Sequence, residues 1–323
     1  MLEQPSFQDF LDAWPIFSDA IWTSMLAGMA LGILGVYIVL GRMVFLTAAL
    51  SQVASLGVAV TYLLSSFIGG LTLSLSPTFG SLIFVLICLV FALRFDEDHR
   101  RDRDAILGIL FVGGSSGTLI IAGIIPQEMA DIQTLLFGSA VAVLPKDLIL
   151  VSTSVALILG LQVLVWRGFV EMIFDPMTAK VRGLPLPLLR WLLVGSLAVM
   201  VATITRILGA LPTFSFTVLP AIVAIRWSPN IARAMLIAGQ IGIFMGVVGY
   251  YIAFIYGFPV GASQTLVGLM LVLFSLTFST LQRLIPTVSR SPSLVSPSEP
   301  RPHHHNPRVG ESSPTLKQHD TVE

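Results

Sequence analysis

The sequence contains few charged residues: Asp, Glu, Lys and Arg together make up 11% of the 323 residues. Soluble domains carry about 25% charged residues. Here 55% of the residues are hydrophobic and the mean hydropathy is +0.88. This composition excludes a soluble globular protein and indicates a polytopic membrane protein. Cysteine is almost absent too, since Cys88 is the only one. Its place in an apolar run favours a small core residue over a redox role.

Several catalytic motifs are also missing. None of the lysines follows a glycine, so the P-loop signature cannot be assembled, and ATP hydrolysis by that route is excluded. There is no His-Glu-x-x-His or Gly-x-Ser-x-Gly arrangement, and the apolar segments contain no histidine. They also lack the buried Asp, Glu and His residues of proton-coupled carriers. We therefore expect no enzyme, no cofactor bound by this chain and no catalytic residues, with energy supplied by another subunit.

Long apolar segments dominate the sequence instead. They cover residues 20–41, 50–68, 78–94, 105–125, 147–166, 186–205, 211–226, 232–256 and 263–281. Most of them approach the length of about 20 residues that a transmembrane helix needs. We therefore predict an all-α membrane helix bundle of about nine transmembrane helices. The segment 211–226 contains Pro212 and Pro220, which disfavour an uninterrupted helix.

The distribution of charge predicts the orientation. Residues 1–19 contain acidic residues but no Lys or Arg, so they lack the basic region of a cleaved signal peptide, and we expect a retained extracytoplasmic leader. If the N-terminus lies outside, all the basic residues before the tail fall on the inner side except Lys146 and Arg206. An excess of basic residues in the inner loops is the usual pattern, and it places the C-terminus in the cytoplasm.

The composition changes near residue 284. Residues 20–283 form the predicted transmembrane domain, whereas residues 284–323 are rich in Pro and Ser and predict a disordered cytoplasmic tail. The tail contains His303, His304 and His305. Adjacent imidazoles on a flexible chain bind transition metals weakly and without fixed geometry. A weak metal-capture site and a tail without a metal role both remain open.

Some polar side chains fall within the apolar segments. Ser51, Gln52 and Ser55 are spaced so that they lie on neighbouring faces of one helix. They are candidates either for interhelical hydrogen bonds or for a polar patch on a translocation path. Arg206 lies near the outer end of its segment, where it either extends to the interface or takes part in a pathway or gate.

The small-residue pairs Gly28/Gly32, Gly113/Gly117 and Gly242/Gly246 recur at a spacing that lets helix backbones approach closely. We interpret these pairs as packing sites inside the bundle.

The stretch Phe174–Leu184 is a short polar segment between apolar ones. Asp175 can cap a helix whose first residue is Pro176, and Gly183 can end it. A helix of about two turns is too short to cross a bilayer, so it must lie at the surface. The predicted topology places it in the cytoplasm, where it can dock on a partner.

The order of several short motifs resembles a known family. These motifs are Gly35–Met43 with Leu50-Ser51, Leu135–Gly138, Val143–Asp147, Phe174–Pro176 with Gly183–Pro185, and Gly209 with Val218–Ala221. The sequence over roughly residues 20–281 is similar to the membrane permease subunits of bacterial ABC importers for zinc and manganese, the ABC-3 group.

The resemblance implies a permease in the bacterial inner membrane that works as a pair, and we expect the partner to be a second copy of this chain. It implies as partners a cytoplasmic ATPase, which would bind the ATP, and an extracytoplasmic metal-binding protein; no nucleic-acid partner is expected. The helix at 174–184 would then be the coupling helix that contacts the ATPase. Its candidate contact residues are Phe174, Asp175, Pro176, Ala179, Lys180, Arg182 and Gly183.

One departure from the family concerns the cargo. The second apolar segment of the family begins with an Asp and a His that are plausible metal ligands, whereas Ala48 and Gln52 stand at these positions here. An amide oxygen is a poorer ligand for zinc than imidazole and suits a harder ion better. The sequence leaves the metal open. It also leaves open a permease for a metal chelate, siderophore or corrinoid, and a membrane scaffold or sensor that transports nothing.

Overall fold

The computed structural model describes residues 7–12, 14–67, 76–94, 100–125 and 143–284. In these ranges every regular element is a helix. The helices are α1 (Phe7–Asp12), α2 (Trp14–Leu40), α3 (Val44–Phe67), α4 (Pro77–Arg94), α5 (Arg100–Ile124), α7 (Pro145–Leu164), α8 (Trp166–Phe174), α9 (Pro176–Val181), α10 (Leu186–Leu208), α11 (Ala210–Trp227), α12 (Ile231–Tyr256) and α13 (Val260–Leu284). The all-α prediction is confirmed, and the tail histidines lie outside the described residues.

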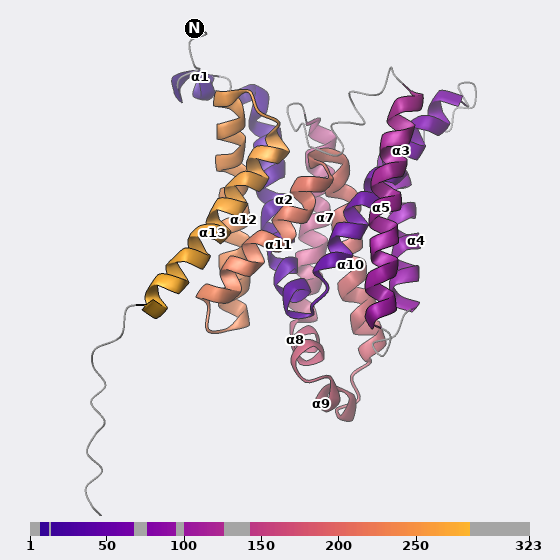
Figure 1. Ribbon diagram of the computed structural model, residues 1–323, viewed down its shortest axis with the longest axis vertical. Helices are drawn as coiled ribbons and strands as arrows, with labels where there is room; N and C mark the ends of the chain where they lie inside the picture. Colours follow the sequence, from indigo (N-terminus) through magenta and orange to yellow (C-terminus); the bar gives the residue numbers. More distant parts are fainter. Residues whose placement is uncertain (1–6, 13, 68–75, 95–99, 126–142, 285–323) are drawn as a thin grey trace, which may run out of the picture. The chain divides into compact units, whose positions relative to one another are not determined.

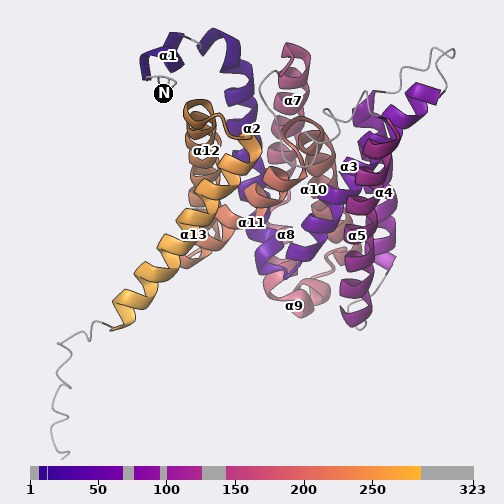
Figure 2. The same cartoon turned by 45° about the horizontal axis from the view of Figure 1, so that its top comes forward.

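Eight of the described helices are long and apolar enough to cross a membrane by length and composition: α2, α3, α5, α7, α10, α11, α12 and α13. The apolar part of α4, Pro77–Leu93, is shorter and packs against α3 and α10. α3, α4 and α5 lie side by side (Figures 1 and 2). Each predicted apolar segment therefore corresponds to one helix. The segment with two prolines is one helix, α11, which continues through Pro220.

The N-terminal residues take part in the packing of the bundle. α2 begins at Trp14, six residues before the predicted segment, and α1 precedes it. The ring of Phe10 in α1 meets the rings of Tyr251 and Phe254 in α12 edge to face, with centroids 5.2 and 5.3 Å apart. Part of the expected leader is thus anchored to α12.

The core is formed where α2 packs against α11 and α12. Gly28 of α2 meets the backbone of Gly242 of α12, and a Cβ on Gly32 would lie 2.6 Å from the carbonyl oxygen of Ala238. Such close backbone approach is available only to small residues. The packing role predicted for the pairs Gly28/Gly32 and Gly242/Gly246 is confirmed. Gly113 of α5 differs, because a Cβ there would meet nothing within 4 Å; its neighbour Gly114 makes the close approach, to the backbone of Gln52.

The chain from α7 to α10 brings the candidate site together. α7 leads into the short helices α8 and α9, and α10 then returns along α7. α8 and α9 lie at the end of the bundle where α10 begins (Figures 1 and 2). α10 also packs against α2, α3, α4 and α11, so it is a central helix of the unit Met1–Leu281.

Candidate functional site

The short helix α9 has the cap and the stop that the sequence predicts. The carboxylate of Asp175 accepts a hydrogen bond from the backbone N–H of Thr178 at 3.0 Å, and Pro176 is the first helical residue. Gly183 takes a positive φ of 76°, and the N–H of Leu184 donates to the carbonyl of Ala179 at 3.0 Å. This is the usual glycine-dependent end of a helix. The local sequence therefore fixes the ends of α9 without help from distant residues.

The cap of Asp175 yields a first prediction. Hydrogen bonds from Thr178 lower the pKa of this carboxyl below its ordinary value. The ionised carboxylate therefore contributes fully to the stability of the helix at any pH above the ordinary pKa, and this contribution is lost only as the pH falls through the lowered pKa. At neutral pH, Asp175→Ala should speed hydrogen–deuterium exchange in residues 176–181 several-fold. Asp175→Asn should leave exchange nearly unchanged, since Asn also caps helices. Equal exchange in the Ala and Asn variants would contradict the assigned cap.

Apolar side chains are exposed on α9 and at the end of α8, and we call them the apolar surface of α9. Phe174, Met177 and Val181 are 58%, 76% and 88% exposed. Lys180 is exposed as well, whereas Ala179 is fully buried and packs against this chain's own residues. Exposed apolar side chains beside a polar rim are typical of a docking surface. Among the predicted contact residues, Ala179 alone is therefore buried.

An ion pair joins α9 to α8. Arg182 Nη1 donates to Glu171 Oε1 at 2.9 Å, and both side chains are partly exposed. Sequence reasoning missed Glu171, Met177 and Val181. A helical projection of residues 166–181 would have shown the apolar face, but nothing in the sequence reveals the pairing across the bend at Asp175.

A cavity of about 550 Å³ lies beside α8. It is open between the end of α2, helix α8 and the turn that joins α11 to α12. Its lining residues are Leu40, Trp166, Phe174, Ile225, Ser228, Pro229, Asn230, Ile231, Ala232 and Ala234. Asn230 caps α12 by accepting from the N–H of Arg233 at 2.9 Å. Phe174 thus belongs both to the apolar surface around α9 and to this cavity.

The candidate polar patch on α3 is largely enclosed. Ser51 and Ser55 are buried, and their hydroxyls donate to the carbonyls of Ala48 and Ser51 in their own helix, at 2.9 and 3.3 Å. Gln52 is half-buried, and its Oε1 is buried without a hydrogen-bond partner in the described part of the chain. Gln52 thus presents an unpaired amide oxygen inside the bundle, where such a group is costly.

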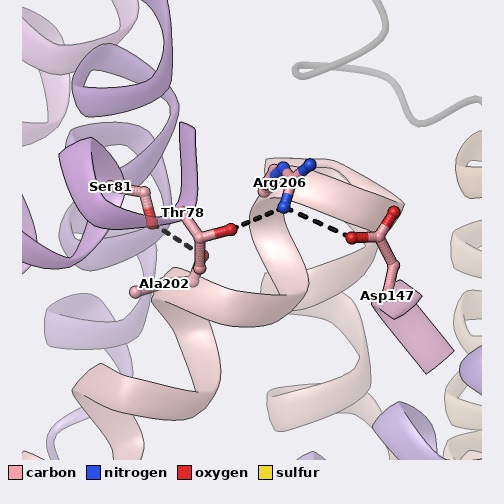
Figure 3. Close-up of polar contacts among 5 residues, drawn as sticks. All are labelled: Thr78, Ser81, Asp147, Ala202 and Arg206. Atoms are coloured by element: carbon pink, nitrogen blue, oxygen red, sulfur yellow. Dashed lines mark hydrogen bonds and ion pairs between the residues drawn. The ribbon is translucent and has the colours of Figure 1, made fainter. Parts of the chain in front are cut away.

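Arg206 lies in a second polar cluster. Its Nη1 donates to Thr78 Oγ1 at 2.6 Å and to Asp147 Oδ1 at 3.3 Å (Figure 3). Asp147 lies in the first turn of α7 and Arg206 in the last turn of α10. Each charge is placed where it interacts favourably with the dipole of its own helix. The antiparallel packing of the two helices then brings the opposite charges together.

The cluster borders a cavity of about 690 Å³ between α4, α7 and α10, which we call the outer cavity because the predicted topology places it on the extracytoplasmic side. Its lining residues are Ser76, Pro77, Thr78, Phe79, Leu82, Lys146, Asp147, Leu150, Val199, Ala202, Thr203 and Arg206. Ser81 of α4 donates to the carbonyl of Ala202 at 2.7 Å beside it (Figure 3). The predicted candidates Ser51, Gln52 and Ser55 do not line this cavity, so Arg206 and the α3 patch are separate sites.

Within the described residues, no group of three or more His, Cys, Asp and Glu side chains is placed to hold a metal ion. The two candidate sites instead present the hydroxyls of Ser51 and Ser55, the amide of Gln52, and the part-buried ion pair of Asp147 and Arg206 with Lys146 nearby.

These features define an all-helical, multi-pass membrane protein with a capped surface helix at one end of a central helix and, at the other end, a cavity bordered by an ion pair. The comparisons with known proteins identify the family. The chain belongs to the ABC 3 transport family, whose model matches residues 13–279. It is accordingly a multi-pass protein of the bacterial cell membrane, as predicted.

Two curated relatives transport metals according to their names. The manganese transport system membrane protein MntC of Listeria monocytogenes is 23% identical over 281 residues, which cover 86% of this chain and 96% of the relative. The high-affinity zinc uptake system membrane protein ZnuB of Haemophilus influenzae is 25% identical over 214 residues, or 65% of this chain and 78% of ZnuB. The resemblance to the ABC-3 permeases that the sequence motifs indicate is thus confirmed.

A solved structure shows the same fold. A chain of PsaBC from Streptococcus pneumoniae, solved in complex with a Fab, superposes with a TM-score of 0.74 at 22% identity. The match covers 86% of this chain and 100% of the PsaBC chain.

Proposed function

We propose that this chain is the transmembrane permease subunit of an ATP-driven importer for a divalent transition metal ion, zinc or manganese. It contacts a separate ATPase through α9 and its flanking residues, and ATP binds to that partner. The observation that carries the proposal is the apolar surface of α9, which the structure presents on a helix with its own cap and stop. Family membership and the names of the relatives support the metal as cargo.

The same proposal includes two further partners. A second copy of the permease completes the membrane part, and an extracytoplasmic metal-binding protein delivers the ion. ATP-driven closure of the ATPase would displace α9 and move the helices attached to it as rigid bodies. The chain itself contributes no catalytic chemistry, so each of its residues acts by binding, positioning or transmitting motion.

Gln52 is the residue that we assign to the cargo path. Its buried Oε1 has no partner in the described residues, so it can accept a bond from a hydrated cation or approach the cation directly. An amide oxygen is a hard ligand and favours Mn²⁺ over Zn²⁺ relative to imidazole. We therefore propose manganese as the preferred cargo.

The test is uptake of radioactive manganese and zinc by cells with and without the gene. Manganese uptake should depend on the gene, and Gln52→Ala should lower it by roughly fivefold, as expected when about 1 kcal/mol of interaction with the passing ion is lost. Gln52→His should shift the preference toward zinc.

Ser65→Ala is the matched control on the same helix, because the exposed Ser65 hydroxyl donates only locally, to the carbonyl of Tyr62 at 2.8 Å. The proposed function would be overturned if the gene supported uptake of neither manganese nor zinc. An unchanged metal profile in Gln52→Ala and Gln52→His would remove Gln52 from the path and leave the function intact.

A further inference from the structure

Two basic residues depart from the charge pattern of the chain. Of all its Lys and Arg residues, only Lys146 and Arg206 fall on the extracytoplasmic side in the predicted topology. The structure brings both to the outer cavity, Lys146 from the first turn of α7 and Arg206 from the last turn of α10. Two cations that are far apart in the sequence therefore border the same cavity, at the outer ends of their helices.

The outer cavity is a groove with an apolar lining beneath these charges. α4 and α7 each pack against α10, and in the described part of the chain they make few or no contacts with each other. α10 thus forms the floor of the groove, and α4 and α7 form its walls. The apolar lining residues are Phe79, Leu82, Leu150, Val199 and Ala202. The volume of about 690 Å³ lies within the range of roughly 300–1,000 Å³ that is usual for sites of small molecules.

Both cations keep hydrogen-bond donors for a ligand. Within the described residues, the contacts of Arg206 with Thr78 and Asp147 both come from Nη1 (Figure 3). A guanidinium has five N–H groups, so those of Nη2 and Nε are left for an acceptor. Lys146 is exposed and forms no ion pair with a described residue. Against these two cations, Asp147 is the only carboxylate among the described residues that line the cavity.

The charge and the lining of the outer cavity together select its occupant. Two cations against one carboxylate repel a divalent metal ion, so the cavity does not suit the proposed cargo. A phosphodiester suits it, because Arg binds phosphate through paired N–H groups and Lys through a point charge. The half-buried side chains of Leu82, Leu150 and Val199 would cover an apolar chain attached to that phosphate. An anionic phospholipid joins these two parts in one molecule.

We propose that the outer cavity binds an anionic phospholipid of the outer leaflet, with its phosphate on Lys146 and Arg206 and an acyl chain in the groove between α4 and α7. The ends of membrane-spanning helices lie at the depth of the headgroups, and basic pockets between such helices bind phosphate headgroups. An acidic loop of a protein partner would pair with the cations but leave the apolar groove unfilled. The inference goes beyond the proposed function, because lipid binding needs neither ATPase nor metal.

Photo-cross-linking tests the site on the full chain. The photoreactive residue p-benzoylphenylalanine replaces Phe79, which is exposed and lines the cavity. The protein is placed in nanodiscs of equal parts phosphatidylglycerol and phosphatidylcholine, and mass spectrometry counts the cross-linked lipids. Phosphatidylglycerol should exceed phosphatidylcholine by at least about threefold. The same probe at Leu157, an exposed residue of α7 outside the cavity, should show no preference.

Two variants separate the headgroup from the acyl chain. Lys146→Gln should remove most of the preference for phosphatidylglycerol without loss of folding, because Lys146 is exposed. Leu150→Trp should fill the groove from α7 and lower the cross-linked phosphatidylglycerol at least about threefold. An unchanged preference in Lys146→Gln, or an unchanged yield in Leu150→Trp, would overturn the lipid site.

The matched controls make the same changes elsewhere. Arg233→Gln removes an exposed cation from α12, and Leu164→Trp enlarges an exposed side chain at the other end of α7. Both should keep the preference and the yield of the unaltered chain, and all four variants should remain monodisperse in size-exclusion chromatography. A control that lost the preference as fully as Lys146→Gln would contradict the assignment to this cavity.

Other occupants predict different results. An excess of inorganic phosphate should leave the preference intact, because a free anion gains nothing from the apolar groove; its loss would assign the cavity to a free anion. No lipid preference in the unaltered chain, together with weaker binding of the metal-binding protein to Lys146→Gln, would assign the cations to a protein contact. Either result would overturn the lipid site. Metal uptake does not enter these measurements, so the proposed function stands or falls separately.

Discussion

Replacing Gly35 by alanine is expected to abolish correct packing of the bundle. A Cβ on Gly35 of α2 would overlap the carbonyl oxygen of Thr217 in α11. Both groups belong to the backbones of tightly packed helices, and Thr217 is fully buried, so no side chain can rotate away. Overpacking of a well-packed core costs roughly 1–3 kcal/mol, and a backbone clash belongs at or above the upper end of that range.

The measurement is size-exclusion chromatography of detergent-solubilised, fluorescently tagged protein, followed by thermal denaturation. Gly35→Ala should lose most of its monodisperse peak, and any surviving protein should denature at least about 6 °C earlier. Gly195→Ala is the matched control, because a Cβ at Gly195 of α10 would meet nothing within 4 Å. It should behave like the unaltered chain. Similar behaviour of both variants would contradict the described approach of α2 to α11.

The sequence predicts helix α9 because the interactions that define its two ends are short in range. Its cap, its first residue and its stop lie between Asp175 and Gly183, and each follows from backbone chemistry that needs no other helix. The apolar segments are predictable for a similar reason, since length and composition alone decide whether a helix can cross the lipid.

Contacts between helices could not be predicted in the same way. Asp147 and Arg206 are 59 residues apart, and only the packing of α7 on α10 shows that they form a pair. The rotation of an apolar helix is also hidden when most of its faces are apolar. This is why Gly113 and Gly114 could not be told apart as the contact with α3. The burial of Ala179 was missed for a different reason, since it depends on the packing of α9 against α8 and α10.

The function assigned to α9 makes a strong prediction for Met177. This side chain is 76% exposed, so Met177→Glu should leave the fold intact. The new carboxylate would lie in the first turn of α9, where a negative charge favours the helix, so loss of α9 cannot explain a defect. An ATPase docked on the apolar surface would bury this charge without a partner. We expect a complex that is at least tenfold weaker, or about 1.4 kcal/mol, and metal uptake reduced by a similar factor.

Met177→Leu is the matched control, since it keeps the volume and the apolar character of the side chain. Co-purification of the ATPase with the tagged permease and uptake of Mn²⁺ should both be normal in this variant and both be lost in Met177→Glu. Normal co-purification in Met177→Glu would show that α9 does not dock through its apolar surface. Lost uptake with the ATPase still bound would instead place the effect of Met177 after docking, in the step that moves the helices attached to α9.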